Sequence, residues 1–266
     1  MSRLNLTSEL RELGVDEGDV LMVHASLRAM GSVEGGAAGV VSALETAVGP
    51  LGTLVMNLCA RDDFDWVNAR PETERPLLLR AAPAFDKNRT PADPDVGVLA
   101  EVFRQLPGTL VNDHPDGRFG ARGRLSAALL QEPLPWDDYY GPGSTLERLV
   151  MAGAKILRLG ADYDTVTLLH LAEYYAELPF KRRVCRHHKV LLPNGTETVR
   201  TVTCLDDTSG IAEWDDEDYF ATILHDYLAR GRAIVGRVGD ARAELIDAAD
   251  FVQHGASWMS QHLARR

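Results

Sequence analysis

The sequence predicts an α/β fold, with helices layered on both faces of a mostly parallel central sheet (an α/β/α arrangement) and an added β-hairpin. Two patterns support this prediction. Apolar, strand-like runs alternate with helical segments along most of the chain, and an Asn194–Gly195 pair separates two alternating runs in its second half. No repeat, low-complexity tract or shift in composition interrupts the 266 residues, of which 45% are hydrophobic. We therefore expect residues 1–266 to form a single domain around a substantial core.

The first 60 residues contain two helices and two strands in alternation. A short helix is expected after Thr7, which is a suitable N-cap, and it should stop at Gly14. The run DVLMVHASL (19–27) predicts a buried strand, residues 36–48 predict a helix, and GTLVMNLC (52–59) repeats the strand pattern. An order of strand, helix and strand favours parallel pairing, because the helix carries the chain back across the sheet.

A long segment at residues 61–95 breaks this alternation. It contains many charges, five prolines and scattered aromatic residues. Loops of this length inside a compact domain usually have a function, so we expect this one to line a pocket. The helical pattern returns in VGVLAEVFRQLPG (96–108), where Pro107 and Gly108 close the helix.

The second half of the chain supplies a strand–helix pair, a hairpin and an alternating tail. AKILRLG (154–160) predicts a strand, and TVTLLHLAEYYAEL (165–178) follows it as an amphipathic helix. Residues 187–205 alternate around the Asn194–Gly195 pair, a turn sequence that two-residue hairpins prefer. The tail at 216–266 alternates helix and strand patterns without a clear linker.

The charge balance and the terminal segments narrow the classes of partner. Asp and Glu number 39 against 28 Lys and Arg, which gives a formal net charge of −11, and the basic residues form no runs. We expect no nucleic-acid partner, because a phosphate-tracking surface needs a basic stripe, whereas cationic small molecules would be attracted. We expect a cytoplasmic protein without a membrane partner, for three reasons. The three cysteines are widely spaced, no apolar run reaches about 18 residues, and the first residues lack the apolar core of a signal peptide.

The helix at 165–178 places one histidine, His170, opposite its apolar stripe. When successive residues are placed about 100° apart around the helix axis, the helix has an apolar and a polar side. The apolar side carries Leu168, Leu171, Ala172 and Tyr175, and the polar side carries Thr167, His170, Glu173, Tyr174 and Glu177. Because the helix directly follows a strand, its first turn should lie at the carboxyl edge of the sheet, where α/β folds bind ligands. We therefore expect His170 to face a cleft, with Glu173 beside it.

Three roles compete for His170: packing, metal binding and proton transfer. A metal site needs converging ligands, and the side chains of His187 and His188, adjacent in a strand, should diverge, so we expect no metal. An imidazole exchanges protons near neutral pH, and a nearby carboxylate would orient it. The chain has no G-x-S-x-G serine, no catalytic cysteine signature and no Walker or dinucleotide motif at GSVEGG (31–36). Proton transfer between two bound substrates therefore fits best.

Five segments, one of them from this helix, can be compared together. They are DVLMVHASLRAMGSVEGGAAGVVSALETAVGPLGTLVM (19–56), GVLAEVFRQLPG (97–108), DHPDGRFGARG (113–123), DTVTLLHLAE (164–173) and GRVGDARAELIDAADFV (236–252). Read in order, they resemble the aminoglycoside 3-N-acetyltransferases of bacterial antibiotic resistance along nearly the whole chain. The resemblance implies a single α/β domain that transfers an acetyl group from acetyl-coenzyme A (acetyl-CoA) to the 3-amino group of the 2-deoxystreptamine ring of aminoglycosides.

The resemblance also implies a catalytic role for His170, which matches the histidine of that family's LHLAE motif. We expect direct transfer, with His170 accepting a proton as the substrate amine attacks the thioester. Many members of the family carry Glu where this chain has Leu205, which leaves Asp206, Asp207 and Glu213 to hold the imidazole. Glu173, three residues along the same helix, is the local competitor for this role. We expect Glu213 to orient the ring and Asp207 to contact the antibiotic.

Further contacts follow from the same resemblance. The coenzyme is expected to lie against the turn that ends the first strand and against the start of the helix near residue 98, through His24, Ala25, Ser26, Leu27 and Val98. His24 is equally well explained as a buried strand histidine. The ammonium groups of the antibiotic are expected to meet carboxylates of the loops and of the histidine helix, namely Asp65, Glu72, Asp164 and Glu173.

Three other functions remain open at this stage. A relative with the same fold could acetylate a different amine in a biosynthetic pathway, or a protein without turnover could bind aminoglycosides or coenzyme A. A metal hydrolase is the third alternative. The range of accepted aminoglycosides depends on the 61–95 loop and on the carboxylates of the cleft, and the sequence carries no signal for an oligomeric state.

Overall fold

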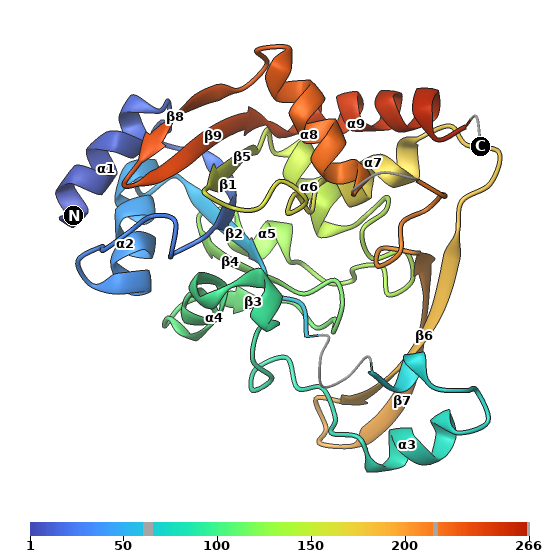
Figure 1. Cartoon of the computed structure of the whole chain (residues 1–266). Coiled ribbons are helices and arrows are strands. Elements are labelled where there is room, and N and C mark those ends of the chain that lie inside the picture. Colours follow the sequence, from blue (N-terminus) through green and yellow to red (C-terminus); the bar gives the residue numbers. More distant parts are fainter. Residues whose placement is uncertain (61–65, 215–217, 265–266) are drawn as a thin grey trace.

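The computed structural model of the protein describes residues 1–60, 66–214 and 218–264 (Figure 1). Its centre is a seven-stranded sheet in the order β3-β4-β2-β1-β5-β9-β8. The strands have the following bounds: β1 Val20–Ala25, β2 Thr53–Asn57, β3 Leu110–Val111, β4 Phe119–Gly123, β5 Lys155–Leu159, β8 Ile234–Val238 and β9 Ala241–Asp247.

The three middle strands of the sheet are parallel. Strand β1 pairs with β2 on one side and with β5 on the other, with Leu21 opposite Leu54 and Lys155. Strands β4 and β9 pair antiparallel with β2 and β5, and the outer strands β3 and β8 pair antiparallel with β4 and β9. The outer strands β3 and β8 therefore run in the same direction as the three middle strands, so that five of the seven strands are parallel to one another. The predicted α/β fold is confirmed.

Helices cover both faces of this sheet, as the sequence predicts. Successive residues of a strand point to opposite faces, and the core divides accordingly: Leu21 and Val23 belong to one buried cluster, whereas Val20 and Met22 belong to the other. On the Leu21 side lie α1 Arg3–Glu12, α2 Gly36–Val48 and α4 Val98–Gln105. On the Met22 side lie α5 Ser126–Leu129, α6 Thr145–Met151, α7 Leu169–Tyr175, α8 Tyr219–Ala229 and α9 Ala248–His262.

The predicted hairpin is a separate two-stranded sheet. Strands β6 (Arg183–Leu191) and β7 (Glu197–Leu205) pair antiparallel, with His187 opposite Thr201. Gly195 of the Asn194–Gly195 turn has a φ of 82°, a left-handed conformation that glycine adopts without strain. Figure 1 shows the hairpin extending away from the central sheet towards helix α3 (Arg75–Ala81).

Three local predictions are wrong. Ser2, not Thr7, caps helix α1, because the helix begins at Arg3 and the Ser2 hydroxyl oxygen accepts from the backbone N–H of Asn5. The segment 66–95 is not a plain loop: it contains α3 and two short 3₁₀ helices at 66–69 and 94–96, and the apolar run before residue 80 gives α3 a face to bury. Helix α7 is shorter than 165–178, since Ala176 has extended backbone.

No helix of the described residues is long and apolar enough to cross a membrane. The three cysteines form no disulfide in the part of the chain that the structure describes. The single-domain assignment of residues 1–266 stays a prediction.

Candidate active site

Three cavities adjoin one another, beginning at the carboxyl ends of β1, β2 and β5 and reaching the residues between β7 and α8. The first, about 190 Å³, contains His24 and is called the His24 cavity; the second, about 260 Å³, is the central cavity; the third, about 240 Å³, is the loop cavity beside residues 206–213. Asn57 and Thr167 line both the first and second, and His170 and Phe220 line both the second and third. The shared walls make one cleft with His170 between its two ends.

His170 lies in the first turn of α7 and its ring is held on three sides. Its Nδ1 lies 2.9 Å from Oε2 of Glu173, one helical turn along. The Tyr140 ring stacks on the imidazole at 4.9 Å with an interplanar angle of 7°, and Phe220 meets it edge-on at 4.8 Å. The His170 side chain keeps 16% exposure, and within the described part of the chain its Nε2 forms no hydrogen bond. This nitrogen is the one available to the cleft.

Glu173 is fully buried, and its side chain is 1% exposed. Burial raises the pKa of this carboxyl group, and the His170 contact and the Tyr219 hydroxyl oppose that rise. The Tyr219 hydroxyl donates to Oε1 of Glu173, so both carboxylate oxygens are engaged. An ionised carboxylate only accepts hydrogen bonds, so Nδ1 of His170 then carries the hydrogen and Nε2 presents its lone pair.

The structure corrects the expected partner of His170. Glu213 has a side chain that is 82% exposed, and it pairs with Arg182 at the rim of the loop cavity rather than with the imidazole. Glu173 makes the contact instead, because residues three apart on a helix lie on the same side. The helical wheel placed Glu173 on a polar, outward side, but α8 brings Tyr219 against that side and closes it from solvent.

Asp207 lies where the central and loop cavities meet, and its charge is already shared. One oxygen lies 2.6 Å from Nη2 of Arg186, and the other accepts from the Tyr139 hydroxyl at 2.6 Å. Its side chain is 3% exposed. Asp206, the neighbouring candidate, instead accepts from the backbone N–H groups of Thr208 and Ser209, which shapes the loop. The contact of Asp207 with the antibiotic stays a prediction.

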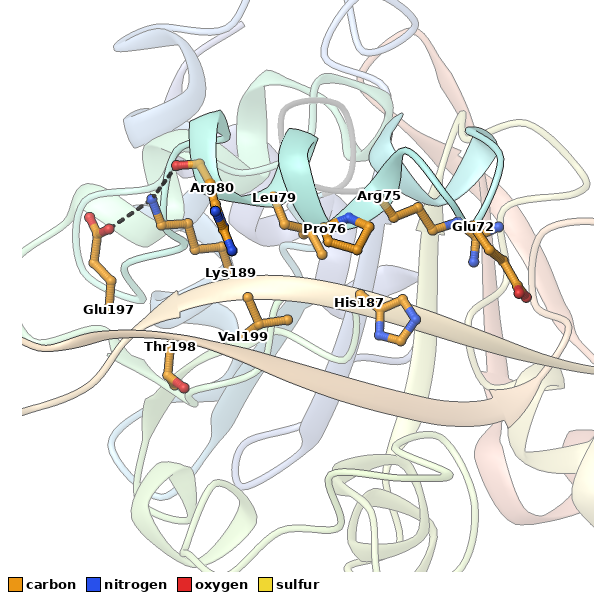
Figure 2. Close-up of a pocket in the computed structure, with 10 residues that line it drawn as sticks. All are labelled: Glu72, Arg75, Pro76, Leu79, Arg80, His187, Lys189, Glu197, Thr198 and Val199. Carbon is orange, nitrogen blue, oxygen red and sulfur yellow. Dashed lines mark hydrogen bonds and ion pairs between the residues drawn. The ribbon is translucent and has the colours of Figure 1, made fainter.

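The remaining predicted carboxylates do not gather at one place. Asp164 lines the central cavity, whereas Asp65 lies outside the described residues. Glu72 lines a different cavity of about 770 Å³ between α3 and the hairpin, where Lys189 pairs with Glu197 at the opposite end (Figure 2). This hairpin cavity is larger than those of the cleft, but His170 does not line it. The structure therefore separates Glu72 from the candidate active site, because α3 folds over the hairpin.

Several side chains of the cleft were missed in the sequence. The carboxylates of Asp93 and Asp95 line the central cavity, and Asp218 lines both the central and loop cavities. The Asp-Pro-Asp run just before α4 was a usable signal, because it stands at the start of a helix near the predicted coenzyme segment. Nothing local marked Tyr140, which reaches His170 from a loop 30 residues earlier in the chain.

The predicted coenzyme residues divide between the cavity and the core. His24, Ala25 and Ser26 line the His24 cavity, but the Ser26 backbone N–H donates to the Leu159 carbonyl and so is not available to a ligand. Leu27 packs against the core cluster beneath α2.

Val98 is exposed at the start of α4, and its neighbours Gly97 and Leu99 line the His24 cavity. The roles of these residues stay predictions.

Burial and, after it, the nearby Arg158 charge lower the pKa of His24 from 6.5 to about 3. The folded protein thus keeps His24 neutral where the unfolded chain binds a proton. The stability that neutral His24 contributes is present above pH 6.5 and falls as the pH drops from 6.5 towards 3, by about 1.4 kcal/mol per pH unit.

Urea unfolding of His24→Gln at pH 7, 6 and 5 tests this effect. The free energy of unfolding of the variant should fall less steeply with decreasing pH than that of the native chain. An equal slope in both proteins contradicts this prediction, and His225→Gln, which changes an exposed histidine, is the control.

The histidines of the hairpin point apart, as predicted. The fully buried side chain of His188 places Nε2 2.9 Å from Asp116, whereas His187 lines the hairpin cavity and its Nδ1 lies 3.0 Å from the Thr201 hydroxyl. Across the described ranges, no group of three or more His, Cys, Asp or Glu side chains is placed to hold a metal ion.

The fold and the cleft are typical of α/β enzymes that bind ligands at the carboxyl edge of a sheet. Residues 22–260 match the family model described as aminoglycoside 3-N-acetyltransferase. The chain belongs to this family, and the resemblance found in the sequence is confirmed.

Individual relatives agree over the full length. The chain is 41% identical to aminoglycoside N(3)-acetyltransferase III of Serratia marcescens, over 97% of each chain. Among solved structures, AAC-IIIb in a binary complex with CoASH has a TM-score of 0.91 and 35% identity, over 100% of this chain and 98% of that one. AAC-VIa with bound sisomicin has a TM-score of 0.90 and 36% identity, over 99% of each chain.

Proposed function

We propose that this protein transfers the acetyl group of acetyl-CoA directly to the 3-amino group of aminoglycosides, with His170 as the general base. Family membership supports the reaction, and relatives of the same fold bind CoASH and sisomicin. The observation that carries the mechanism is the geometry of His170: Glu173 holds Nδ1, and Nε2 is left at the junction of the two ends of the cleft.

The two ends of the cleft suit two different substrates. The His24 cavity is bounded by the small residues Ala25, Ser26 and Gly97, which leave room for the narrow pantetheine arm of the coenzyme. The thioester would then enter the central cavity beside His170. Besides Glu173, the central and loop cavities are lined by six acidic residues, whereas the His24 cavity is lined by two, Asp95 and Asp162; the six are Asp93, Asp95, Asp164, Asp207, Glu213 and Asp218. Several carboxylates acting together can steer and orient a polycation, although one exposed pair contributes only about 0–1 kcal/mol.

In the proposed reaction, the residues of this chain account for every proton that moves. The 3-amino nitrogen attacks the thioester carbonyl carbon, so that an N–C bond forms and the C–S bond breaks. Nε2 of His170 takes the proton of the attacking amine, and the Glu173 carboxylate stabilises the imidazolium that results. The same proton then passes to the departing thiolate, which leaves as coenzyme A. Holding both substrates in one cleft lowers the barrier further.

Incubation with acetyl-CoA and a panel of aminoglycosides tests the proposed function. We expect singly acetylated products whose fragmentation in the mass spectrometer places the acetyl group on the 3-nitrogen, with release of one thiol per product. Aminoglycosides that lack a free 3-amino group should give no product. Acetylation at another nitrogen would contradict the regiochemistry, and acetylation only of unrelated amines would favour the biosynthetic alternative.

A further inference from the structure

Tyr219 connects two parts of the cleft that are far apart in the sequence. Its hydroxyl donates to Oε1 of Glu173 and accepts, at 3.2 Å, from the backbone N–H of Ile211. The Tyr219 side chain is buried, and its ring meets Phe220 edge-on at 5.2 Å. One phenol thus contacts both the carboxylate that holds His170 and the loop at residues 206–213 that walls the loop cavity.

The loop at 206–213 is itself well anchored. The backbone N–H of Arg182 donates to the Ile211 carbonyl at 2.7 Å, and its guanidinium donates to the Ser209 and Gly210 carbonyls at 3.1 and 3.2 Å. Gly210 has a φ of 81°, and a Cβ there would lie 2.8 Å from a carbon of the Tyr219 ring. Glycine is therefore required for the ring to sit against the loop.

We propose that Tyr219 is a positioning residue that couples the 206–213 loop to the His170–Glu173 pair. This inference rests on the proposed role of His170 as the base. By donating to Oε1, the phenol draws negative charge away from the oxygen that faces His170, and so limits how strongly Glu173 retains the imidazole proton. Because the Tyr219 oxygen also accepts from the backbone N–H of Ile211, the anchored 206–213 loop fixes where the phenol lies against Glu173.

Several other titratable groups share these cavities with His170: Asp93, Asp95 and Asp164 line the central cavity, and Arg182 and Glu213 line the loop cavity. Tyr140 stacks on the ring from its loop, and Asp207 and Asp218 line the same cavities from the residues after β7 and before α8. The Tyr140 hydroxyl donates to the Asp116 carbonyl and Asp207 accepts from the Tyr139 hydroxyl, whereas Tyr219 donates to Oε1 of Glu173. Burial keeps the pKa of Tyr219 well above its ordinary value, so the phenol remains a donor throughout the working pH range.

The phenylalanine variant isolates the hydroxyl. In Tyr219→Phe we expect the pKa of His170, followed by NMR titration of its ring nitrogens without substrates, to rise by about half a unit or more. We also expect kcat to fall about tenfold with its acidic limb moved to higher pH, while KM for acetyl-CoA is unchanged. Tyr175→Phe is the matched control. Tyr175 lies in the same helix as Glu173, but its hydroxyl donates to Glu147, so its removal should leave the His170 pKa and kcat unaltered.

A second variant keeps the hydroxyl in place. Incorporation of 3-fluorotyrosine at position 219 makes the phenol a stronger donor and should lower the His170 pKa, which is opposite to the effect of Tyr219→Phe. An unchanged His170 pKa in both variants would overturn the coupling, even if the native protein acetylates aminoglycosides. If the native protein does not acetylate them, the substrate-free titration still tests the contact, so the two failures are distinguishable.

Discussion

Replacement of His170 by alanine is expected to lower the rate constant of acetyl transfer by a factor of about 10²–10⁴, because the proposed mechanism then has no base to remove the proton of the attacking amine. Binding of acetyl-CoA should persist, since the His24 cavity lies beyond the central one and His170 does not line it. The measurement is thiol release under saturating substrates, together with calorimetric titration of the coenzyme.

Two outcomes of the His170→Ala experiment would change the interpretation. Unchanged acetylation would refute the assignment of His170 as the base, whatever the family membership. Protection of cells against aminoglycosides without acetylation would favour sequestration of the antibiotic. His225→Ala is the matched control, because this exposed histidine stacks on Tyr163 and does not line the cleft, so its activity should equal that of the native protein.

Glu173→Gln is expected to lower kcat about 10²-fold or more. A glutamine can donate an N–H to Nδ1 of His170, which favours the tautomer with hydrogen on Nε2 and removes the lone pair that the amine needs. It also leaves the imidazolium without a negative partner. Glu213→Gln should change kcat less than about threefold, because its exposed pair with Arg182 is weak and does not reach the imidazole. Single-turnover kinetics of the two variants measure the difference.

Stability separates a chemical effect of Glu173→Gln from a structural one. Burial raises the pKa of Glu173, so a neutral amide of the same shape should leave the free energy of unfolding equal or higher at neutral pH. Urea unfolding checks this directly. A large loss of activity in Glu213→Gln with near-normal activity in Glu173→Gln would restore the carboxylate first expected from the sequence.

Most of the fold could be predicted from local patterns. The parallel strands β1, β2 and β5 are buried on both faces and therefore appear as apolar runs, and the hairpin carries its own turn signal at Asn194–Gly195. The antiparallel strands β3 and β4 were not predicted, since β3 has two residues and β4, Phe119–Gly123, contains two glycines and an arginine. Helix α3 was hidden because its apolar residues lie between prolines and charges.

The site was predictable only in its central residue. His170 stands in a helix directly after a strand, and both facts are local, so its position in the cleft followed from periodicity and from the carboxyl-edge rule. The acidic composition was compatible with a cationic partner as well as with solubility alone, and it did not indicate which carboxylates lie near each other. Asp93, Asp95 and Asp218 reach the cleft from separate segments, and Glu72, which belongs to the same loop region as Asp93, lies in the hairpin cavity.

The sequence by itself determined the α/β class, the hairpin, the histidine helix and the family resemblance, because each depends on residues close together in the chain. Only the tertiary structure decided that Glu173 holds His170, that Tyr219 holds Glu173 and that Glu213 is exposed. A helical wheel shows which side of a helix is polar, but α8 closes that side through a contact between residues 46 positions apart. Such contacts arise from packing between distant elements, which no local pattern encodes.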